Sequence, residues 1–379
     1  MEGPQQPLPD TGATAPVMGG SAVPEGKWRD TAAVLFGGQQ GCTGVLIAPT
    51  VVMTAAHCID NTLNAVLIGT NSLAKPSLGE TIMVSRRLTY PQNKYDIAIV
   101  VLAQASTVTP RRLATGWAQS DIVNGARVQF VGYGAVDRNA QSYVDEMQEA
   151  ESTVTDANCT THAGCDTAAR PNGEIGAGGA GIDTCPGDSG GPMYLLTSYG
   201  EFLAGITSRG YDNNQFDCSE GGIYTRPDKS DIVTWVETQA QVYLPDGRGP
   251  IADKLFVQPG GENSLTVDPN DVQSGRAYTW EIVTPPAHGT ATIDASGKLT
   301  VVAAADYLGP DAVVVRATDT TDTTRSARGR VEVEVVEELP EGEDGGCCDA
   351  GSGPDGRVAP ALLVLGALLL RRRRRTFAA

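Results

Sequence analysis

The sequence predicts an all-β protein, and three observations lead to that prediction. Short runs of β-branched and apolar residues recur along the chain with turn residues between them, and no long segment shows a helical period. Glycine and proline are abundant, at 45 and 23 residues, whereas aromatic residues make up only 6%. This composition is typical of loop-rich β proteins, and the spacing of the runs favours an antiparallel barrel.

Length and charge narrow the possible classes of protein. The 379 residues suffice for two domains, or for one large domain with appendages, and a hydrophobic fraction of 41% is enough to build cores. The net charge of -17 argues against nucleic acid or anionic lipid as a partner of the folded part, but it is compatible with cationic peptides.

The expected strands of the first half are short apolar runs. They cover residues 33–36, 45–47, 51–53, 66–68, 97–102 and 128–131. One later segment differs: in residues 231–239, Ile232, Trp235 and Val236 are spaced i, i+3 and i+4, which places them on one face of a helix. The pattern therefore predicts a helix at this point in an otherwise β-rich chain.

The most informative stretch is Cys-Pro-Gly-Asp-Ser-Gly-Gly-Pro at residues 185–192. Its glycines allow close backbone approach, so the N–H groups of Gly187 and Ser189 are able to point at one place, where an oxyanion would form. A serine hydroxyl is a weak nucleophile and needs a base and an orienting acid from elsewhere in the chain. The stretch predicts Ser189 as a nucleophile.

Candidates for the base and the acid are both present. The candidate base, His57, lies in Thr-Ala-Ala-His-Cys at residues 54–58, and the chain has only three histidines. The candidate acid, Asp96, stands at the head of an apolar run. The alternative for His57 is a core histidine beside a disulfide.

The motifs around His57, Asp96 and Ser189, in that order, resemble those of the trypsin/chymotrypsin family of serine peptidases. The resemblance implies a double six-stranded antiparallel β-barrel with the catalytic residues in the cleft between the barrels. It also implies that Ser189 attacks the scissile carbonyl, His57 transfers the proton, Asp96 orients the imidazole, and Gly187 and Ser189 form the oxyanion hole. The implied activity is that of a serine endopeptidase that forms an acyl-enzyme and needs no cofactor.

The same resemblance implies a specificity pocket. Asp183 matches the floor position that selects Arg or Lys, and Ser208, Gly210 and Gly222 match positions along the pocket walls. A buried carboxylate without an internal partner prefers a cationic ligand. The alternative for Asp183 is a solvated turn residue.

One position departs from the family pattern beside this pocket. Arg209 stands where the family usually has an aromatic residue near the pocket mouth. It would either pair with Asp183 or repel a basic substrate. An active peptidase of non-tryptic preference therefore stays an alternative.

Val17-Met18-Gly19-Gly20 resembles the mature N-terminus of that family. The resemblance implies cleavage before Val17, which frees an α-amine that pairs with Asp188 and shapes the pocket. Pro16 departs from the family, which commonly has Arg or Lys there, so self-activation is not expected. The alternative is that Val17 is the first strand residue of a protein that needs no cleavage.

Six of the eight cysteines lie in the first 220 residues. An even set of six in such a domain predicts disulfides and an oxidising compartment. The family resemblance implies the bridges Cys42–Cys58 and Cys185–Cys218, which leaves Cys159 and Cys165 to form the third.

Two candidate metal sites are weak. Cys159, His162 and Cys165 are an alternative set of metal ligands, but a fourth ligand is lacking. Some family members bind calcium in the loop near Glu80, where this chain has no acidic partner. We therefore predict no metal site.

A second, smaller domain is expected in residues 251–338. Seven strand patterns occur there, at 254–257, 264–267, 277–282, 290–293, 298–302, 312–317 and 330–336. In the last of these, valines alternate with glutamates, so one face is expected to be buried and the other wet. This number of short strands suggests a β-sandwich, and the segments 286–293 and 307–311 resemble bacterial immunoglobulin-like or cadherin-like repeats.

The C-terminal sequence resembles a myxobacterial sorting tail, in which a cysteine, a short apolar helix and an arginine cluster follow one another. Residues 339–357 predict a flexible linker that contains Cys347 and Cys348. In residues 358–375, a short apolar helix precedes five arginines that would stay cytoplasmic. The resemblance implies a processing protease that cleaves near the two cysteines, transient membrane contact and delivery to the cell surface. An ordinary membrane anchor is the alternative.

The predicted organisation is a pro-segment or remnant at 1–16, a peptidase domain at 17–244, the sandwich at 251–338, the linker at 339–357 and the tail at 358–375. We expect an exported serine endopeptidase that cleaves protein or peptide substrates after Arg or Lys, without a nucleic-acid partner. The main alternative is an inactive peptidase-fold adhesin or surface binding protein, in which the second domain does the binding.

Overall fold

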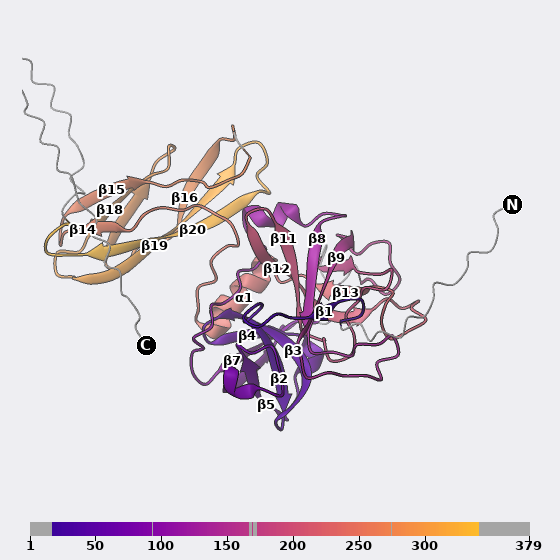
Figure 1. The fold of residues 1–379 in the computed structure, drawn as a ribbon. Helices are drawn as coiled ribbons and strands as arrows, with labels where there is room; N and C mark the ends of the chain where they lie inside the picture. The colour runs from indigo at the N-terminus through magenta and orange to yellow at the C-terminus, as the bar shows by residue number, and fades with distance from the viewer. Residues whose placement is uncertain (1–16, 93, 167–168, 170–172, 274, 341–379) are drawn as a thin grey trace, which may run out of the picture. The chain divides into compact units, whose positions relative to one another are not determined.

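The computed structural model describes residues 17–340, apart from 93, 167–168, 170–172 and 274 (Figure 1). The chain forms two compact units, Met1–Leu339 and Pro340–Ala379, and the elements below belong to the first. They are almost all strands, arranged as two closed barrels and two further sheets. The predicted all-β class, with a double six-stranded barrel, is therefore confirmed.

The first barrel closes in the order β2-β3-β4-β7-β6-β5. Its strands are β2 (Thr31–Phe36), β3 (Gln39–Ala48), β4 (Val51–Thr54), β5 (Leu63–Ile68), β6 (Glu80–Thr89) and β7 (Ala98–Leu102). The apolar runs predicted as strands lie in β2, β3, β4, β5 and β7. The sequence pattern missed β6, because this strand is largely polar and its side chains are mostly exposed or half-buried.

The second barrel closes because β9 pairs with β8 as well as with β10. Its strands are β8 (Arg127–Gly132), β9 (Gln148–Asp156), β10 (Glu174–Ala177), β11 (Pro192–Thr197), β12 (Gly200–Gly210) and β13 (Gly222–Thr225), with the short β1 (Ser21–Ala22) added on β9. Of these, only β8 was predicted. The others are short, glycine-rich or interrupted by bulges, so their own sequences carry little periodicity.

The predicted helix is present as α1 (Ser230–Ala240), with Ile232 and Val236 fully buried. It ends at Gln241, which adopts the left-handed conformation of a helix C-cap. Three short 3₁₀ helices complete the helical elements of the described chain: η1 (Ala56–Cys58), η2 (Pro76–Leu78) and η3 (Trp117–Asp121).

The predicted sandwich consists of a sheet in the order β14-β20-β19-β16 and a sheet in the order β15-β18-β17. Its strands are β14 (Leu255–Val257), β15 (Glu262–Thr266), β16 (Tyr278–Thr284), β17 (Gly289–Ile293), β18 (Lys298–Ala303), β19 (Gly309–Asp319) and β20 (Ser326–Val335). In β20, Val331, Val333 and Val335 are buried and Glu332 is exposed, as the alternation predicts. The buried valines pack with Leu299 and other apolar residues of both sheets.

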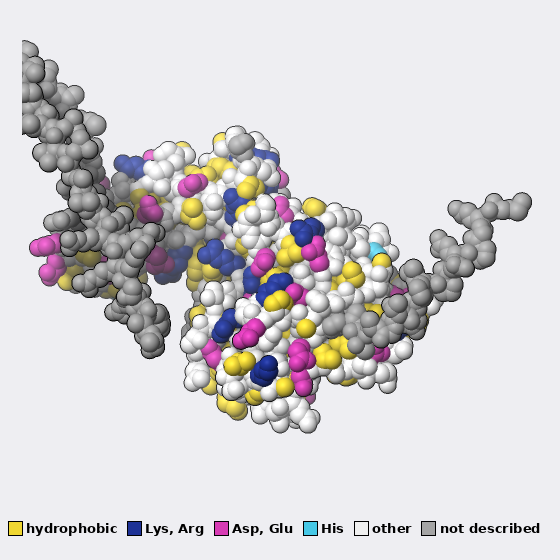
Figure 2. All heavy atoms as spheres, viewed as in Figure 1, with side chains coloured by type: hydrophobic (Ala, Val, Ile, Leu, Met, Phe, Trp, Pro, Cys, Tyr) yellow, Lys and Arg dark blue, Asp and Glu magenta, His cyan; other side chains and the backbone are white. Residues whose placement is uncertain are grey.

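The predicted apolar helix and arginine cluster of the tail lie outside the described residues. None of the helices that the structure describes is long and apolar enough to cross a membrane. On the face shown in Figure 2, acidic and basic side chains are interspersed rather than gathered into a patch of one sign.

Candidate active site

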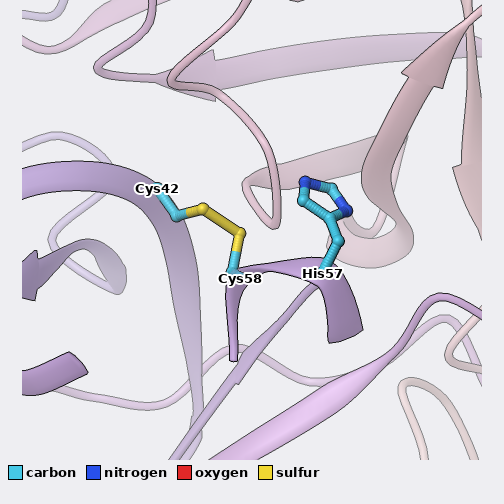
Figure 3. Close-up of side chains that lie close together, drawn as sticks. All are labelled: Cys42, His57 and Cys58. Carbon is cyan, nitrogen blue, oxygen red and sulfur yellow. A yellow bond between two sulfur atoms is a disulfide. The ribbon is translucent and has the colours of Figure 1, made fainter. Parts of the chain in front are cut away.

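His57 lies on η1, directly after β4 of the first barrel. The disulfide Cys42–Cys58 joins this turn to β3, with 6.3 Å between the Cα atoms (Figure 3). The His57 side chain is 46% exposed, so the alternative of a core histidine is wrong. The disulfide thus fixes a short helix that presents an accessible imidazole.

Asp96 holds this imidazole by two contacts. Its Oδ1 accepts the backbone N–H of His57 at 2.9 Å, and its Oδ2 lies 2.8 Å from Nδ1. The side-chain hydrogen bond to Asp96 raises the pKa of His57, although burial opposes the shift. The ring is therefore oriented with Nδ1 toward the carboxylate, and within the described chain Nε2 makes no hydrogen bond.

Ser208, on β12, supplies a further contact to the same carboxylate. Its hydroxyl donates to Asp96 Oδ2 at 2.7 Å. Burial alone would raise the pKa of Asp96, but the hydrogen bonds from His57 and Ser208 and the charge of the imidazolium hold that pKa below its ordinary value. Asp96 is thus kept ionised between the two barrels.

The loop with Ser189 packs against the segment that precedes His57. Thr43 donates its backbone N–H to the Ser189 carbonyl at 2.8 Å. A Cβ on Gly190 would lie 2.0 Å from Thr54 Oγ1 and 2.7 Å from the Ala55 nitrogen, so only glycine permits this approach. No hydrogen bond joins Ser189 Oγ to His57 within the described residues, and such bonds often tighten only when substrate is bound.

The backbone of Gly187 is oriented by two hydrogen bonds to its carbonyl. Gln40 Nε2 donates to that oxygen at 3.0 Å, and Thr43 Oγ1 donates at 2.9 Å. Gly187 has φ +98°, a conformation that favours glycine. In the described part of the molecule, neither the Gly187 N–H nor the Ser189 N–H donates to another group, so both are available to an oxyanion.

Asp183 is 1% exposed, so the alternative of a solvated turn residue is wrong. Its carboxylate accepts backbone N–H groups of Gly221 and Thr184, at 2.9 and 2.8 Å. Burial raises the pKa of Asp183 to about 6, against the pull of these hydrogen bonds. It forms no ion pair with any other described residue, and it is therefore a buried acidic group without an internal cation.

The predicted wall residues have separate surroundings. A Cβ on Gly222 would lie 3.5 Å from Asp183 Oδ1, so this glycine borders the carboxylate directly, whereas a Cβ on Gly210 would meet Asn214 at 3.1 Å. Ser208 contacts Asp96 rather than Asp183. The structure therefore brings Gly222, and not Ser208, against the acidic group.

Arg209 does not pair with Asp183, so that expected alternative is wrong. Its guanidinium forms a bidentate ion pair with Glu174, at 2.9 and 3.1 Å. The Glu174 side chain is only 1% exposed. Sequence reasoning missed this glutamate, because a single acidic residue on a short strand carries no pattern that would single it out.

Asp188 and Val17 are both fully buried. Asp188 accepts the backbone N–H groups of Gly134 and Cys185, at 2.7 and 2.9 Å, and burial raises its pKa to about 7. Met18, the residue after Val17, accepts the Asp183 N–H at its carbonyl at 3.1 Å, so this segment lies against the loop that contains Asp183 and Asp188. Within the described chain Asp188 has no ion-pair partner.

The described residues contain three disulfides, and each joins cysteines paired in the sequence analysis: Cys42–Cys58, Cys159–Cys165 and Cys185–Cys218. Cys159 and Cys165, which the sequence left as alternative metal ligands, are therefore not thiolates, and the His162 ring stacks on Tyr211. Cys42, His57 and Cys58 also lie within 4.8 Å of one another, but both sulfurs are bonded to each other. Glu80, which lies near the loop where some family members bind calcium, accepts hydrogen bonds from Thr107.

Comparisons with known proteins agree with this architecture. The family model described as Trypsin matches residues 17–236, and the model described as Bacterial Ig domain matches residues 248–332. The resemblance to bacterial immunoglobulin-like domains is therefore confirmed.

Individual relatives match between about half and three fifths of the chain. Human serine protease 56 is 31% identical over 57% of this chain, which spans 38% of that relative's length. Brachyurin from Leptuca pugilator is 27% identical over 60% of this chain and 99% of its own length, and glucanase inhibitor protein 1 from Phytophthora sojae is 30% identical over 55% and 84%. The solved structure of neuropsin, a serine protease of mouse brain, covers 58% of this chain and 98% of its own, with 26% identity and a TM-score of 0.48. Because the Trypsin model matches residues 17–236, which is more than half of the chain, the chain belongs to the trypsin family, with a bacterial Ig domain after the two barrels.

Proposed function

We propose that this chain is a serine endopeptidase in which Ser189 is the nucleophile, His57 the base and Asp96 the orienting acid. The observation that supports it most is the double contact of Asp96 with His57, which leaves Nε2 of an exposed imidazole without a partner in the described chain. The human and mouse relatives named serine protease 56, each 31% identical, support the same activity.

The reaction follows from these positions. Ser189 Oγ attacks the carbonyl carbon of the scissile peptide while His57 Nε2 takes its proton, and Asp96 stabilises the imidazolium that forms. The N–H groups of Gly187 and Ser189 hold the developing oxyanion, and the loss of one such donor typically costs about 10²–10³ in rate. His57 then protonates the leaving amine. In the second half of the reaction, water attacks the acyl carbonyl carbon while His57 takes a proton from it, and His57 returns that proton to Ser189 Oγ as the acid product leaves.

We assign the preference for Arg or Lys to Asp183. A buried carboxylate without an internal cation gains most from a substrate side chain that brings one. Arg209 does not supply that cation, because Glu174 and neighbouring groups already bind its guanidinium.

We further propose that the chain is a zymogen. Cleavage before Val17 would place a cationic α-amine beside buried Asp188, which otherwise lacks a cation in the described structure. The charge pair would then fix the loop that contains the oxyanion-hole donors.

The test is hydrolysis of paired Arg and Phe peptide amides by chain processed to begin at Val17. Arg cleavage that disappears in Ser189→Ala, but persists in a control such as Ser85→Ala on β6, supports both the catalytic residues and Asp183. Cleavage of Phe and not Arg would keep the catalytic residues and reject the pocket assignment. The absence of Ser189-dependent hydrolysis, together with no labelling of Ser189 by a fluorophosphonate, would reject the peptidase.

A second candidate function is binding without catalysis. Two relatives are named glucanase inhibitor proteins, and each is 30% identical to this chain over slightly more than half of its length. In this alternative the fold serves as a surface binding protein or adhesin with the Ig domain. Fluorophosphonate labelling separates the two candidates, because it needs an activated serine but no substrate specificity.

We also propose that the protein is exported and sorted to the cell surface through residues 339–375. The three disulfides support an oxidising compartment. Mass spectrometry of the surface fraction should find a C-terminus near Cys347 or Cys348, and replacement of both by alanine should keep the tail attached. An intact tail on surface-exposed protein would instead favour a membrane anchor.

A further inference from the structure

The guanidinium of Arg209 lies one hydrogen bond away from the carboxylate network of the proposed active site. Its Nη1 donates to Ser208 Oγ at 3.2 Å, and the Ser208 hydroxyl donates to Asp96 Oδ2 at 2.7 Å. That same oxygen faces His57 Nδ1 at 2.8 Å. Arg209, Ser208, Asp96 and His57 thus form one continuous chain of hydrogen bonds.

Arg209 is anchored on several sides. Nη1 and Nη2 donate to the two carboxylate oxygens of Glu174, and Nη2 also donates to the Gly164 carbonyl at 2.7 Å. These three bonds and the one to Ser208 account for the four N–H groups of the two terminal nitrogens. Because the guanidinium is planar and rigid, the four contacts fix its orientation.

The anchors of Arg209 are themselves held in place. Glu174 Oε2 also accepts the backbone N–H of Asp166 at 2.8 Å. Gly164 lies in the loop that the Cys159–Cys165 disulfide closes. The position of Arg209 is therefore set by β10 and by this loop, and not by the catalytic residues.

The direction of each bond gives Ser208 a defined role. A hydroxyl has a single proton, and when Arg209 occupies an acceptor site of Ser208 Oγ, that proton is free to point at Asp96. Hydrogen bonds in series polarise one another, so the bond from Arg209 strengthens the donation by Ser208. A stronger hydrogen bond from Ser208 draws negative charge away from the Asp96 Oδ2 atom that also faces His57 Nδ1, so the carboxylate stabilises the imidazolium less.

We propose that Arg209, held by Glu174, is a positioning residue that acts through Ser208 on Asp96 and so sets how firmly His57 keeps its proton. The inference rests on the proposed peptidase function and adds a regulator of its catalytic base. Neither Glu174 nor the role of Arg209 is visible in the sequence motifs.

Several other groups face the same region and must be considered with His57. The cavity beside it has a volume of about 650 Å³. Lys94 and Asp166, which both line this cavity, form an ion pair at 3.1 Å. The ionisable groups that line it besides His57 are Tyr90, Lys94, Tyr95, Asp96, Asp166, Arg209 and Asp212. The variants below leave Lys94, Asp166 and Asp212 unchanged, so only the charge of the Arg209–Glu174 pair differs among them.

The experiment compares the pH dependence of kcat/KM for a short Arg amide among three variants of the chain processed to begin at Val17. The acid limb of this profile, the fall in kcat/KM at low pH, reports the pKa of His57. In Arg209→Gln we expect the acid limb to move to higher pH by roughly half a unit, because Asp96 holds the imidazolium more firmly. In Glu174→Gln we expect it to move down by about as much, because Arg209 then acts as an unpaired cation. The double variant loses the Arg209 donor to Ser208 but leaves no unpaired charge at residue 174. Its acid limb should therefore move to higher pH by less than that of Arg209→Gln.

Two controls keep the test decisive. Arg127→Gln removes a cation from an exposed ion pair with Glu151 on the same barrel and should leave the acid limb unchanged. If Arg209→Gln fails to fold because Glu174 is left buried and unpaired, Glu174→Gln and the double variant still give shifts of opposite sign.

Unchanged acid limbs in Glu174→Gln and the double variant, with Ser189-dependent activity retained, would overturn the role of Arg209 and leave a merely structural ion pair. Loss of Ser189 labelling in the parent protein would instead reject the peptidase function itself. Titration of the His57 ring protons by NMR in the Ser189→Ala background should reproduce the same order of shifts without turnover.

Discussion

Two neighbouring regions of the second barrel bury acidic groups in opposite ways. In the loop before and including Ser189, Asp183 and Asp188 accept backbone N–H groups but have no ion-pair partner in the described chain. In the adjacent strands, Glu174 is just as buried, yet it forms a bidentate ion pair with Arg209. Burial without an internal cation is costly, whereas a paired charge is compensated.

The two regions therefore differ in whether a buried carboxylate has a cationic partner within the described chain: Asp183 and Asp188 have none, and Glu174 has Arg209. In the proposed function, the carboxylates of Asp183 and Asp188 gain most from cations that arrive from outside, namely a basic substrate and a newly formed N-terminal amine. The Glu174–Arg209 pair already balances its own charges, and in the proposal above it holds a hydrogen-bond donor against Ser208.

The largest expected effect comes from removal of the unpaired pocket charge. Asp183→Asn should lower kcat/KM for an Arg amide by roughly 10²–10⁴, because a buried cation that loses its partner costs about 3–5 kcal/mol. Cleavage of a Phe amide should change little. Asp217→Asn, an exposed carboxylate nearby, is the matched control. Equal losses for the Arg and Phe amides would show that Asp183 supports the fold and not the specificity.

The next effect concerns Asp188 and the N-terminal amine. Chain that begins at Val17 should be more active and should melt several degrees higher than chain with one extra N-terminal glycine, because only the first places an amine at Asp188. Asp188→Asn should remove this difference between the two forms. Identical melting temperatures in the parent protein would favour the alternative in which Val17 needs no cleavage.

The pH dependence of binding tests the pocket charge without turnover. The pKa of Asp183 is raised to about 6, so the carboxyl takes up a proton as the pH falls through that value. Affinity for benzamidine should therefore be full above this pH and fall by up to tenfold per pH unit below it. Calorimetry on Ser189→Ala measures this directly, and an equally steep curve in Asp183→Asn would assign the dependence to another group, such as His57.

The smallest expected effect is on stability. Removal of Cys159–Cys165 by a double change to serine should cost about 2 kcal/mol of unfolding free energy, and removal of Cys42–Cys58 about 3 kcal/mol, because the first closes a shorter loop. Denaturant titrations give both values.

Removal of Cys159–Cys165 should also disturb the acid limb of kcat/KM, since this disulfide holds the Gly164 carbonyl that anchors Arg209. A normal acid limb would show that Glu174 alone suffices as the anchor.

Much of the site was predictable because its chemistry depends on local motifs. The segments around His57, Asp96 and Ser189 each need particular neighbours, such as the glycine after Ser189 that passes close to Thr54 and Ala55. The strands of the first barrel other than β6 were predictable for a similar reason, because their apolar runs are buried, whereas β6 is largely polar and exposed. Strands of the second barrel were missed where bulges and glycines break the alternation.

The sequence by itself determined the fold class and the residues of the proposed catalytic centre, because each depends on short patterns of residues. The cysteine pairs came from the family resemblance that these patterns carry, which implied two bridges and left Cys159 and Cys165 for the third. Only the tertiary structure decided the partner of Arg209. Glu174 and Arg209 are separated in sequence by the whole serine loop, and they meet because β10 and β12 both pair with β13. The charge balance of the site therefore depends on strand pairing, which no local pattern in the chain specifies.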